Sequence, residues 1–225
     1  MNKLVISLIL LASFASAVMA EERQWRLVTD RDGIRVYMAH NDDSPIKTFR
    51  GEAVVPMSDF RAIGNHVDDY DFVASWMHMI SSISDLGRDS GVERRIWVTT
   101  RLPWPVSNRD APLNLQISQE PDSFAVVVAY EAEQSLMPPQ SGYVRMPELK
   151  GMLRFMPVKP GEVHVTFEVV LDPGGYIPAW IANLILRDIP YFSLRRFQRV
   201  ADQERFRQKD TGYYRIPPGW PESEQ

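Results

Sequence analysis

The chain has 225 residues, no cysteine and a formal net charge of −4 at pH 7. The lack of cysteine excludes disulfides, thiolate catalysis, cysteine-based zinc sites and a lipid-modified N-terminal cysteine. The negative charge argues against general nucleic-acid binding, which needs a basic face for the phosphates. A chain of this length is expected to form one sizeable domain that is held together by its hydrophobic core.

The N-terminus has the layout of a secretory signal peptide. Asn2 and Lys3 give a short positive start, residues 4–18 are apolar apart from three serines, and small residues continue to Ala20. The apolar run is shorter than the ~20 residues that span a membrane. We expect cleavage after Ala20 (or Ala17) and a periplasmic or secreted protein, with an uncleaved anchor as the alternative. Without residues 1–20 the net charge is −5, from 24 basic and 29 acidic residues.

Alternating apolar and polar residues predict strands in the first part of the chain. Residues 34–38 and 49–55 show this alternation, and the Asp32-Gly33 turn precedes the first of them. A short helix is expected over residues 58–67, where apolar residues fall on one face. The acidic residues within 68–71 are interpreted as a solvated bend, because the distal glutamate of a calcium loop is missing.

The second part of the chain has a stronger strand pattern. Alternation predicts strands over residues 95–102, 124–130, 153–157 and 163–171, with a hairpin turn at 159–162. A period of two residues means that one face is buried and the other is wet, as is usual in an antiparallel sheet.

A long amphipathic helix is expected after the turn at residues 172–175. Apolar residues then recur at three- and four-residue steps, which predicts a helix of up to 30 residues starting near Pro178. Pro190 should kink or split this helix. Residues 210–225 have no period and are expected to be extended or disordered. Three aromatic residues could attach them to the surface: Tyr213, Tyr214 and Trp220.

These elements leave space to fill between sheet and helix. The apolar stripe of one helix is on the order of 10 Å wide. A sheet of six or seven strands spaced ~4.8 Å apart has a face about 30 Å wide. Either large side chains or a bound ligand must therefore occupy the concave face, and the pattern alone leaves both alternatives open.

Four segments resemble the START domains, the steroidogenic-acute-regulatory-related lipid transfer family. Residues 103–110 (PWPVSNRD) resemble the family's P-x-P-x-S-x-R-D segment. Residues 172–181 resemble its D-x-G-G approach to the C-terminal helix, and residues 142–145 resemble its V-R strand. Trp25 together with residues 32–37 resembles its opening. The four segments occur in the family order and span nearly the whole chain after residue 20.

This resemblance implies an α+β helix-grip fold. A curved antiparallel sheet would wrap around the long C-terminal helix and enclose a hydrophobic tunnel for one lipid or sterol-like molecule. We expect a signal peptide at 1–20, the START-like domain at 21–209 and a tail at 210–225. Some family members carry a charged pair deep in the tunnel, and no such pair can be placed here.

Seven residues are the candidates for contact with a ligand. For the apolar ones, ordinary core packing is the alternative. Arg145, if buried, needs a partner, either a carboxylate such as Glu131 or Glu133 or a polar group of the ligand. A buried tyrosine hydroxyl would likewise seek a partner. The seven are Tyr130, Arg145, Phe155, Phe167, Trp180, Leu184 and Phe192.

Five further residues of the resembling segments are expected to have structural roles: Trp104, Arg109, Asp110, Gly175 and Pro178. Arg109 and Asp110 could instead bind a lipid head group, although an Arg-Asp pair in a proline-rich loop more often anchors that loop. No two of the four histidines have metal-ligand spacing, and no catalytic or cofactor motif is present.

The leading hypothesis is a periplasmic protein that binds a lipid or other hydrophobic molecule and carries or presents it. Its partners would be that ligand and, transiently, a membrane surface; no nucleic acid, metal or cofactor is expected, and no pattern indicates an oligomeric state. One alternative is an enzyme of the polyketide cyclase or aromatase type acting in the same tunnel, with Tyr130 and Arg145 as the best available pair. Another is a sensor or chaperone module whose own side chains fill the tunnel.

Overall fold

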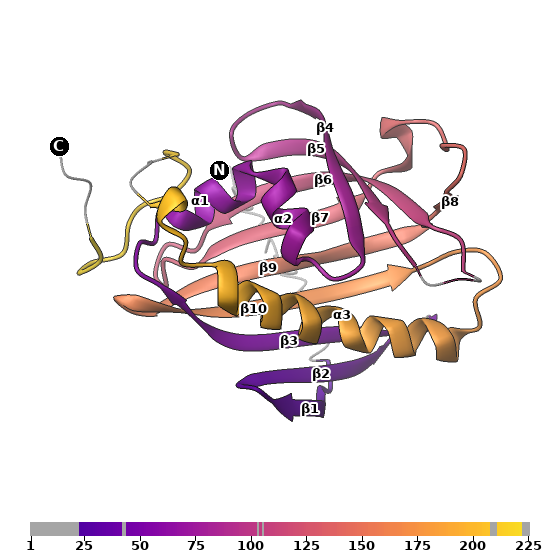
Figure 1. The fold of residues 1–225 in the computed structure, drawn as a ribbon, viewed down its shortest axis with the longest axis horizontal. Coiled ribbons are helices and arrows are strands. Elements are labelled where there is room, and N and C mark those ends of the chain that lie inside the picture. Colours follow the sequence, from indigo (N-terminus) through magenta and orange to yellow (C-terminus); the bar gives the residue numbers. More distant parts are fainter. Residues whose placement is uncertain (1–22, 42–43, 103, 105, 208–210, 222–225) are drawn as a thin grey trace, which may run out of the picture.

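A ten-stranded sheet curves around one long helix in this protein (Figure 1). The computed structural model describes residues 23–41, 44–102, 104, 106–207 and 211–221. The expected signal peptide lies outside the described residues. The curved antiparallel sheet and the C-terminal helix together give the α+β helix-grip architecture that was expected.

The sheet has the order β1-β2-β3-β10-β9-β7-β6-β5-β4, with every neighbouring pair antiparallel. The short strand β8 is the exception, because it pairs in parallel with β6. The strands are β1 (Arg26–Arg31), β2 (Ile34–Asn41), β3 (Ser44–Met57), β4 (Ile80–Arg88), β5 (Glu93–Thr100), β6 (Arg109–Gln119), β7 (Val126–Ala132), β8 (Val144–Arg145), β9 (Glu148–Lys159) and β10 (Gly161–Asp172).

In the described residues, three α-helices accompany the sheet: α1 (Ala62–Asp68), α2 (Tyr70–Trp76) and α3 (Ala179–Val200). The same part of the chain also contains two short 3-10 turns, η1 (Gln134–Leu136) and η2 (Glu204–Phe206). The helix expected at 58–67 begins only at Ala62. The expected solvated bend is instead a helix start, because the Asp69 carboxylate caps α2 by accepting from the Phe72 N–H at 2.8 Å.

Helix α3 crosses the concave face of the sheet and packs mainly on β3 (Figure 1). It continues through Pro190 and ends at Val200, so it is neither split nor as long as 30 residues. Pro190 is buried where α3 meets β3. A glycine, Gly51, occupies the facing position of β3 and allows this close approach.

The alternation along the strands buries one face against α3. On β10, Val163, Val165, Phe167 and Val169 are all at most 2% exposed, as the alternation predicted. The hairpin between β9 and β10 also forms as expected, with Gly161 in the left-handed region at φ +89°.

The described part of the tail, residues 211–221, forms bends and one turn but no helix or strand, and it packs on α1. Trp220 is only 5% exposed, and its ring lies 5.2 Å from the ring of Phe60. The Tyr214 hydroxyl accepts from the Gly64 N–H at 2.7 Å and donates to the Phe60 carbonyl at 3.0 Å. These contacts attach the described part of the tail to the fold through Tyr214 and Trp220.

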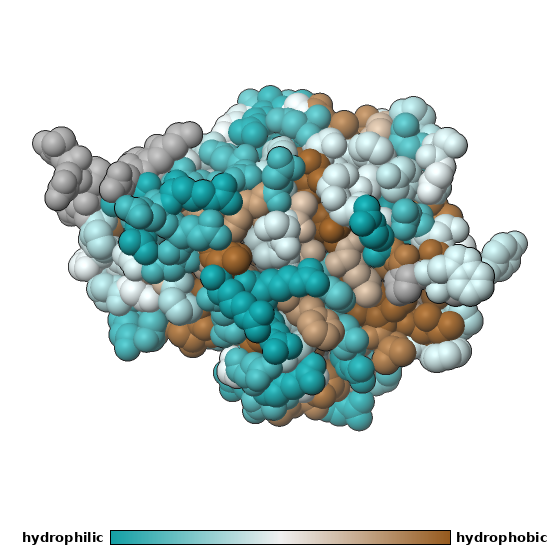
Figure 2. All heavy atoms as spheres, in the orientation of Figure 1, coloured by the Kyte–Doolittle hydropathy of each residue, from teal (hydrophilic) through white to brown (hydrophobic). Residues whose placement is uncertain are grey.

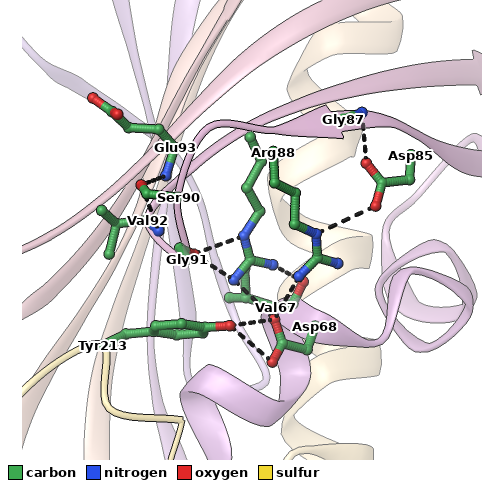
Figure 3. Close-up of polar contacts among 11 residues, drawn as sticks. Val67, Asp68, Asp85, Gly87, Arg88, Ser90, Gly91, Val92, Glu93 and Tyr213 are labelled. Carbon is green, nitrogen blue, oxygen red and sulfur yellow. Dashed lines mark hydrogen bonds and ion pairs between the residues drawn. The ribbon is translucent and has the colours of Figure 1, made fainter.

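A buried arginine, Arg94, joins the tail, α1 and the β4–β5 turn beside Asp68 and Tyr213, which Figure 3 labels. The Arg94 side chain donates to the Gly91 and Val67 carbonyls, and its Nη2 lies 2.8 Å from the Asp68 carboxylate. The Tyr213 hydroxyl donates to the same carboxylate at 3.1 Å. These contacts fix the tail beside the end of α1.

Candidate functional site: an apolar cavity beneath the long helix

A cavity of about 150 Å³ lies between the concave face of the sheet and α3, and its wall is almost entirely apolar. Strands β4 to β7, β9 and β10 form one side, and α2 and α3 cover the other. Apolar cavities of this size stay dry and can accept small apolar ligands. Its apolar lining includes Ile96, Val98, Leu113, Leu115, Val128, Leu153, Val169, Ala182, Ile185, Leu186 and Ile189.

Three of the seven candidate ligand contacts line this cavity: Tyr130, Phe155 and Phe167. They lie on the inward positions of β7, β9 and β10, where strand alternation placed them. Contact with a ligand stays a prediction for all three.

The helical candidates do not line the cavity. Trp180 is 70% exposed and Leu184 is 49% exposed, while Phe192 packs on the His78 ring at 4.9 Å. The prediction that these three residues form the cavity wall is therefore wrong. The apolar stripe of α3 is wider than the face that meets the sheet, and the lining is formed by Ala182, Ile185, Leu186 and Ile189.

Arg145 also lies outside the cavity lining. Its guanidinium forms two hydrogen bonds to the Asp110 carboxylate, at 3.0 and 2.9 Å, and it also donates to the Met137 and Pro138 carbonyls. The Trp97 indole donates to the same carboxylate at 2.9 Å. The expected partners Glu131 and Glu133 are therefore replaced by Asp110, and the pair anchors β8 to β6.

The Tyr130 hydroxyl is already engaged. It donates to the Glu168 carbonyl at 3.0 Å, beside Gly151, where a Cβ atom would lie 2.6 Å from the hydroxyl. Burial raises the pKa of Tyr130, so the phenol stays protonated. Tyr130 thus offers its ring to the cavity, with its hydroxyl bound to the backbone.

The sequence analysis missed two polar residues of the cavity wall, the histidines His66 and His78. His66 is 2% exposed and lies among the rings of Phe72, Phe197 and Phe206. Burial lowers the pKa of His66 to about 3, so its ring is neutral near pH 7. Burial also lowers the pKa of His78. One signal in the sequence could have placed His66 inward. It follows Ile63 by three residues, so the two lie on the same face of the helix, and that face is apolar.

Arg109 is the charged residue of the wall. Strand alternation places it on the same face of β6 as Ala111 and Leu113, and it is 4% exposed. Its guanidinium donates to three carbonyls: Ser107 in the β5–β6 loop, and Pro173 and Gly174 in the β10–α3 loop. Arg109 therefore joins the two loops at this end of the cavity by hydrogen bonds.

The other residues with expected structural roles have different surroundings. Asp110 is fully buried in its pair with Arg145, and Gly175 has φ +68° beside Arg109. Pro178 directly precedes α3, which begins at Ala179. Trp104 is 92% exposed, so it packs against little of the fold. Among the described residues, no group of three histidine or acidic side chains could hold a metal ion.

The sequence matches the START domain family over residues 6–205. The chain belongs to this family. A solved structure from Xanthomonas axonopodis, described as a STAR-related lipid transfer protein, has a TM-score of 0.71 and 28% identity; the alignment covers 80% of this chain and 99% of that one. Human StAR-related lipid transfer protein 5 shares the fold, with a TM-score of 0.70 and 16% identity over 78% of this chain and 85% of that one.

Two further proteins are similar to this chain in sequence. An uncharacterized protein of Pseudomonas aeruginosa is 28% identical over 192 residues, which cover 85% of this chain and 94% of that protein. The mouse phosphatidylcholine transfer protein is 22% identical over 172 residues, covering 75% of this START chain and 79% of its own length.

Proposed function

We propose that this START protein binds a lipid or another hydrophobic small molecule in the cavity beneath α3 and carries or presents it in the periplasm. The observation that carries the proposal is the apolar cavity beneath α3. Burial of apolar surface contributes ~25 cal/mol per Å², which favours an apolar ligand in this space over one in water. The relatives named for lipid transfer support the ligand class, and the signal-peptide pattern of residues 1–20 supports the compartment.

The cavity must expand when such a ligand enters. Its volume of about 150 Å³ is below the ~300–1,000 Å³ typical of small-molecule sites. The cover is formed by α3 and by the β5–β6 and β10–α3 loops, and its displacement would enlarge the space. Exchange would then be gated by the motion of this cover.

A membrane surface is the proposed donor or acceptor. Large apolar side chains are exposed near the cover: Trp104, Tyr176, Trp180 and Leu184. Figure 2 shows apolar residues gathered over the N-terminal half of α3. Exposed aromatic groups of this kind favour the boundary between water and lipid. No helix in the described ranges is long and apolar enough to cross a bilayer.

The enzyme alternative receives no support from the described geometry. Tyr130 lines the cavity, whereas Arg145 lies outside it in its pair with Asp110, so the two do not meet. The mouse relative and the Xanthomonas axonopodis structure are both named for lipid transfer.

Native mass spectrometry of protein purified without detergent from a bacterial periplasm tests the proposal. We expect a discrete added mass that organic extraction identifies as a lipid. A protein that stays free of ligand after incubation with mixed phospholipids, fatty acids and sterols would contradict it.

A further inference from the structure

The wall of the cavity beneath α3 exposes almost no nitrogen or oxygen atom in the part of the chain that the structure describes. Several of the lining side chains are nevertheless polar, so their polar atoms must be bound or covered elsewhere. A polar group of a ligand that entered this space would need one of these atoms as a partner, because burial of a polar group without a hydrogen bond is costly.

Three of the polar side chains form hydrogen bonds with the backbone. The Tyr130 hydroxyl donates to the Glu168 carbonyl at 3.0 Å. The Thr100 hydroxyl accepts from the Arg109 N–H at 3.0 Å and donates to the Arg109 carbonyl at 3.3 Å. The Arg109 guanidinium donates to three loop carbonyls. Each of these groups would have to give up a bond within the protein before it could bind a ligand.

The aromatic side chains at the α1–α2 end of the cavity expose carbon to it. The Tyr70 hydroxyl and the Trp76 indole nitrogen have no hydrogen-bond partner among the described residues, and both atoms are covered by protein. The neutral His66 ring is enclosed by three phenylalanine rings, and the His78 ring packs on Phe192 at 4.9 Å. The wall at this end therefore recognises hydrocarbon and offers little to a head group.

The cavity reaches partly exposed side chains beside α3. Residues 77–80, which connect α2 to β4, all line the cavity, and all are only partly buried. Ile185 and Ile189 on α3 also line it and are also only partly buried. The α2–β4 connection passes beside α3 (Figure 1), where the His78 N–H donates to the Ser193 hydroxyl at 2.9 Å. The polar end of a bound chain can remain in water at this border.

We propose that the ligand is a chain lipid held by its hydrocarbon alone, with the chain beneath α3 and the head group in water beside the α2–β4 connection. This inference rests on the proposed function and specifies which part of the ligand that site binds. The protein then selects for an apolar chain and accepts different head groups, because the head group makes no buried hydrogen bond.

Nuclear magnetic resonance of labelled palmitate tests this placement without altering the shape of the ligand. Delipidated full-length mature protein is loaded with palmitate that carries carbon-13 either at the carboxyl carbon or at the terminal methyl carbon. A water-soluble gadolinium chelate is then added, which broadens the signals of exposed atoms. We expect strong broadening of the carboxyl signal and little broadening of the methyl signal.

Two adjacent substitutions on β7 locate the protected methyl group. Val128→Phe fills part of the cavity and should abolish the protection of the methyl carbon, whereas Val127→Phe, on the other face of the sheet, should keep it. The measurement on wild-type protein stands by itself if Val128→Phe does not fold.

A competition between two lysophospholipids tests the tolerance for head groups. Palmitoyl-lysophosphatidylcholine and palmitoyl-lysophosphatidylglycerol have the same chain, with a zwitterionic head in the first and an anionic head in the second. The protein is supplied with an equimolar mixture, and the bound ratio is measured by extraction and mass spectrometry. We expect a ratio within about threefold of one, whereas a charge-assisted bond to one head group would give about tenfold or more.

The inference and the carrier function can fail separately. Protection of both ends of palmitate, or a bound ratio beyond about threefold, would overturn the inference and leave the carrier function standing. A methyl carbon as accessible as the carboxyl carbon would contradict both, because the chain would then lie outside the cavity. If wild-type protein binds neither palmitate nor either lysophospholipid, both are contradicted as well.

Discussion

Gly51 on β3 lies directly under Pro190 of α3. A Cβ atom on Gly51 would be 2.7 Å from the Pro190 Cβ and 2.8 Å from the Leu194 Cδ1. The closest part of the helix–sheet contact therefore depends on the absence of a side chain, and this contact sets how near α3 lies to the sheet and to the cavity.

Gly51→Ala should destabilise the protein by about 1–3 kcal/mol, because overpacking forces the helix away from the sheet. An alanine in a strand is otherwise at least as favourable as glycine, so a loss isolates the steric effect. Denaturant unfolding measures the change. Val54→Ala, at a half-exposed position of the same strand, is the control and should change stability by about 0.5 kcal/mol or less. If Gly51→Ala left the free energy of unfolding unchanged, the helix would be free to shift and the close contact would not set its position.

Stability should fall in acid partly because of His66. Its pKa is lowered to about 3 in the folded protein from about 6.5 when unfolded, so the unfolded chain binds the proton more tightly. The neutral His66 ring therefore contributes fully to the free energy of unfolding above pH 6.5, and this contribution is lost as the pH falls from 6.5 towards 3. At pH 4 the free energy of unfolding should be lower than at pH 7 by on the order of 3 kcal/mol from this residue.

His66→Phe isolates this contribution, because it keeps an aromatic ring among Phe72, Phe197 and Phe206 and removes the titration. Denaturant unfolding at pH 7 and pH 4 should show a smaller acid loss in the variant than in wild-type protein. Equal losses in the two proteins would contradict the assignment of a buried, neutral histidine.

The tail should contribute to stability through Trp220. Trp220→Ala is expected to cost about 3–5 kcal/mol, because it empties a buried position against Phe60. Trp104→Ala is the matched control at a 92% exposed position and should cost about 0.5 kcal/mol or less. Thermal or denaturant unfolding distinguishes them, and equal effects would mean that residues 211–221 do not pack as described.

Membrane contact should depend on the exposed aromatic residues near α3. Replacing both Tyr176 and Trp180 by serine is expected to weaken binding to lipid vesicles about tenfold, with folding stability nearly unchanged, because both side chains are exposed. Val158→Ser, at an exposed position on the β9–β10 hairpin, is the control. Co-sedimentation with vesicles measures the effect, and undiminished binding by the double variant would place the contact elsewhere.

The elements that the sequence predicted well are those with one buried face. β3, β5, β7 and β10 alternate clearly because they lie between other strands and against the core. The edge strand β4 escaped prediction because only Ile80, Ile83 and Leu86 interrupt a largely exposed and polar segment. β6 was missed because it begins inside the RD segment and contains Pro112, which is unusual in a strand with partners on both sides.

The cavity wall was predictable only where the periodicity is strict. Strand alternation correctly placed Phe155 and Phe167 inward, because a period of two allows only two faces. The α3 stripe is broader than its contact with the sheet, so Trp180 and Leu184 could not be distinguished from Ile185 and Ile189. Arg145 was wrongly placed among the candidate ligand contacts. Its strand, β8, has only two residues, so no alternation of apolar and polar residues shows which face its side chain is on.

The central claim is that a hydrophobic ligand occupies the space beneath α3, and a pair of adjacent substitutions on β7 tests it most directly. Val128 lines the cavity, whereas its neighbour Val127 points to the other face of the sheet. We would measure the lipid retained by wild-type, Val128→Phe and Val127→Phe proteins after identical loading. The account predicts that Val128→Phe, which fills part of the cavity, loses most of the bound lipid while Val127→Phe keeps it. Equal retention by both variants would contradict the claim and place the ligand outside this cavity.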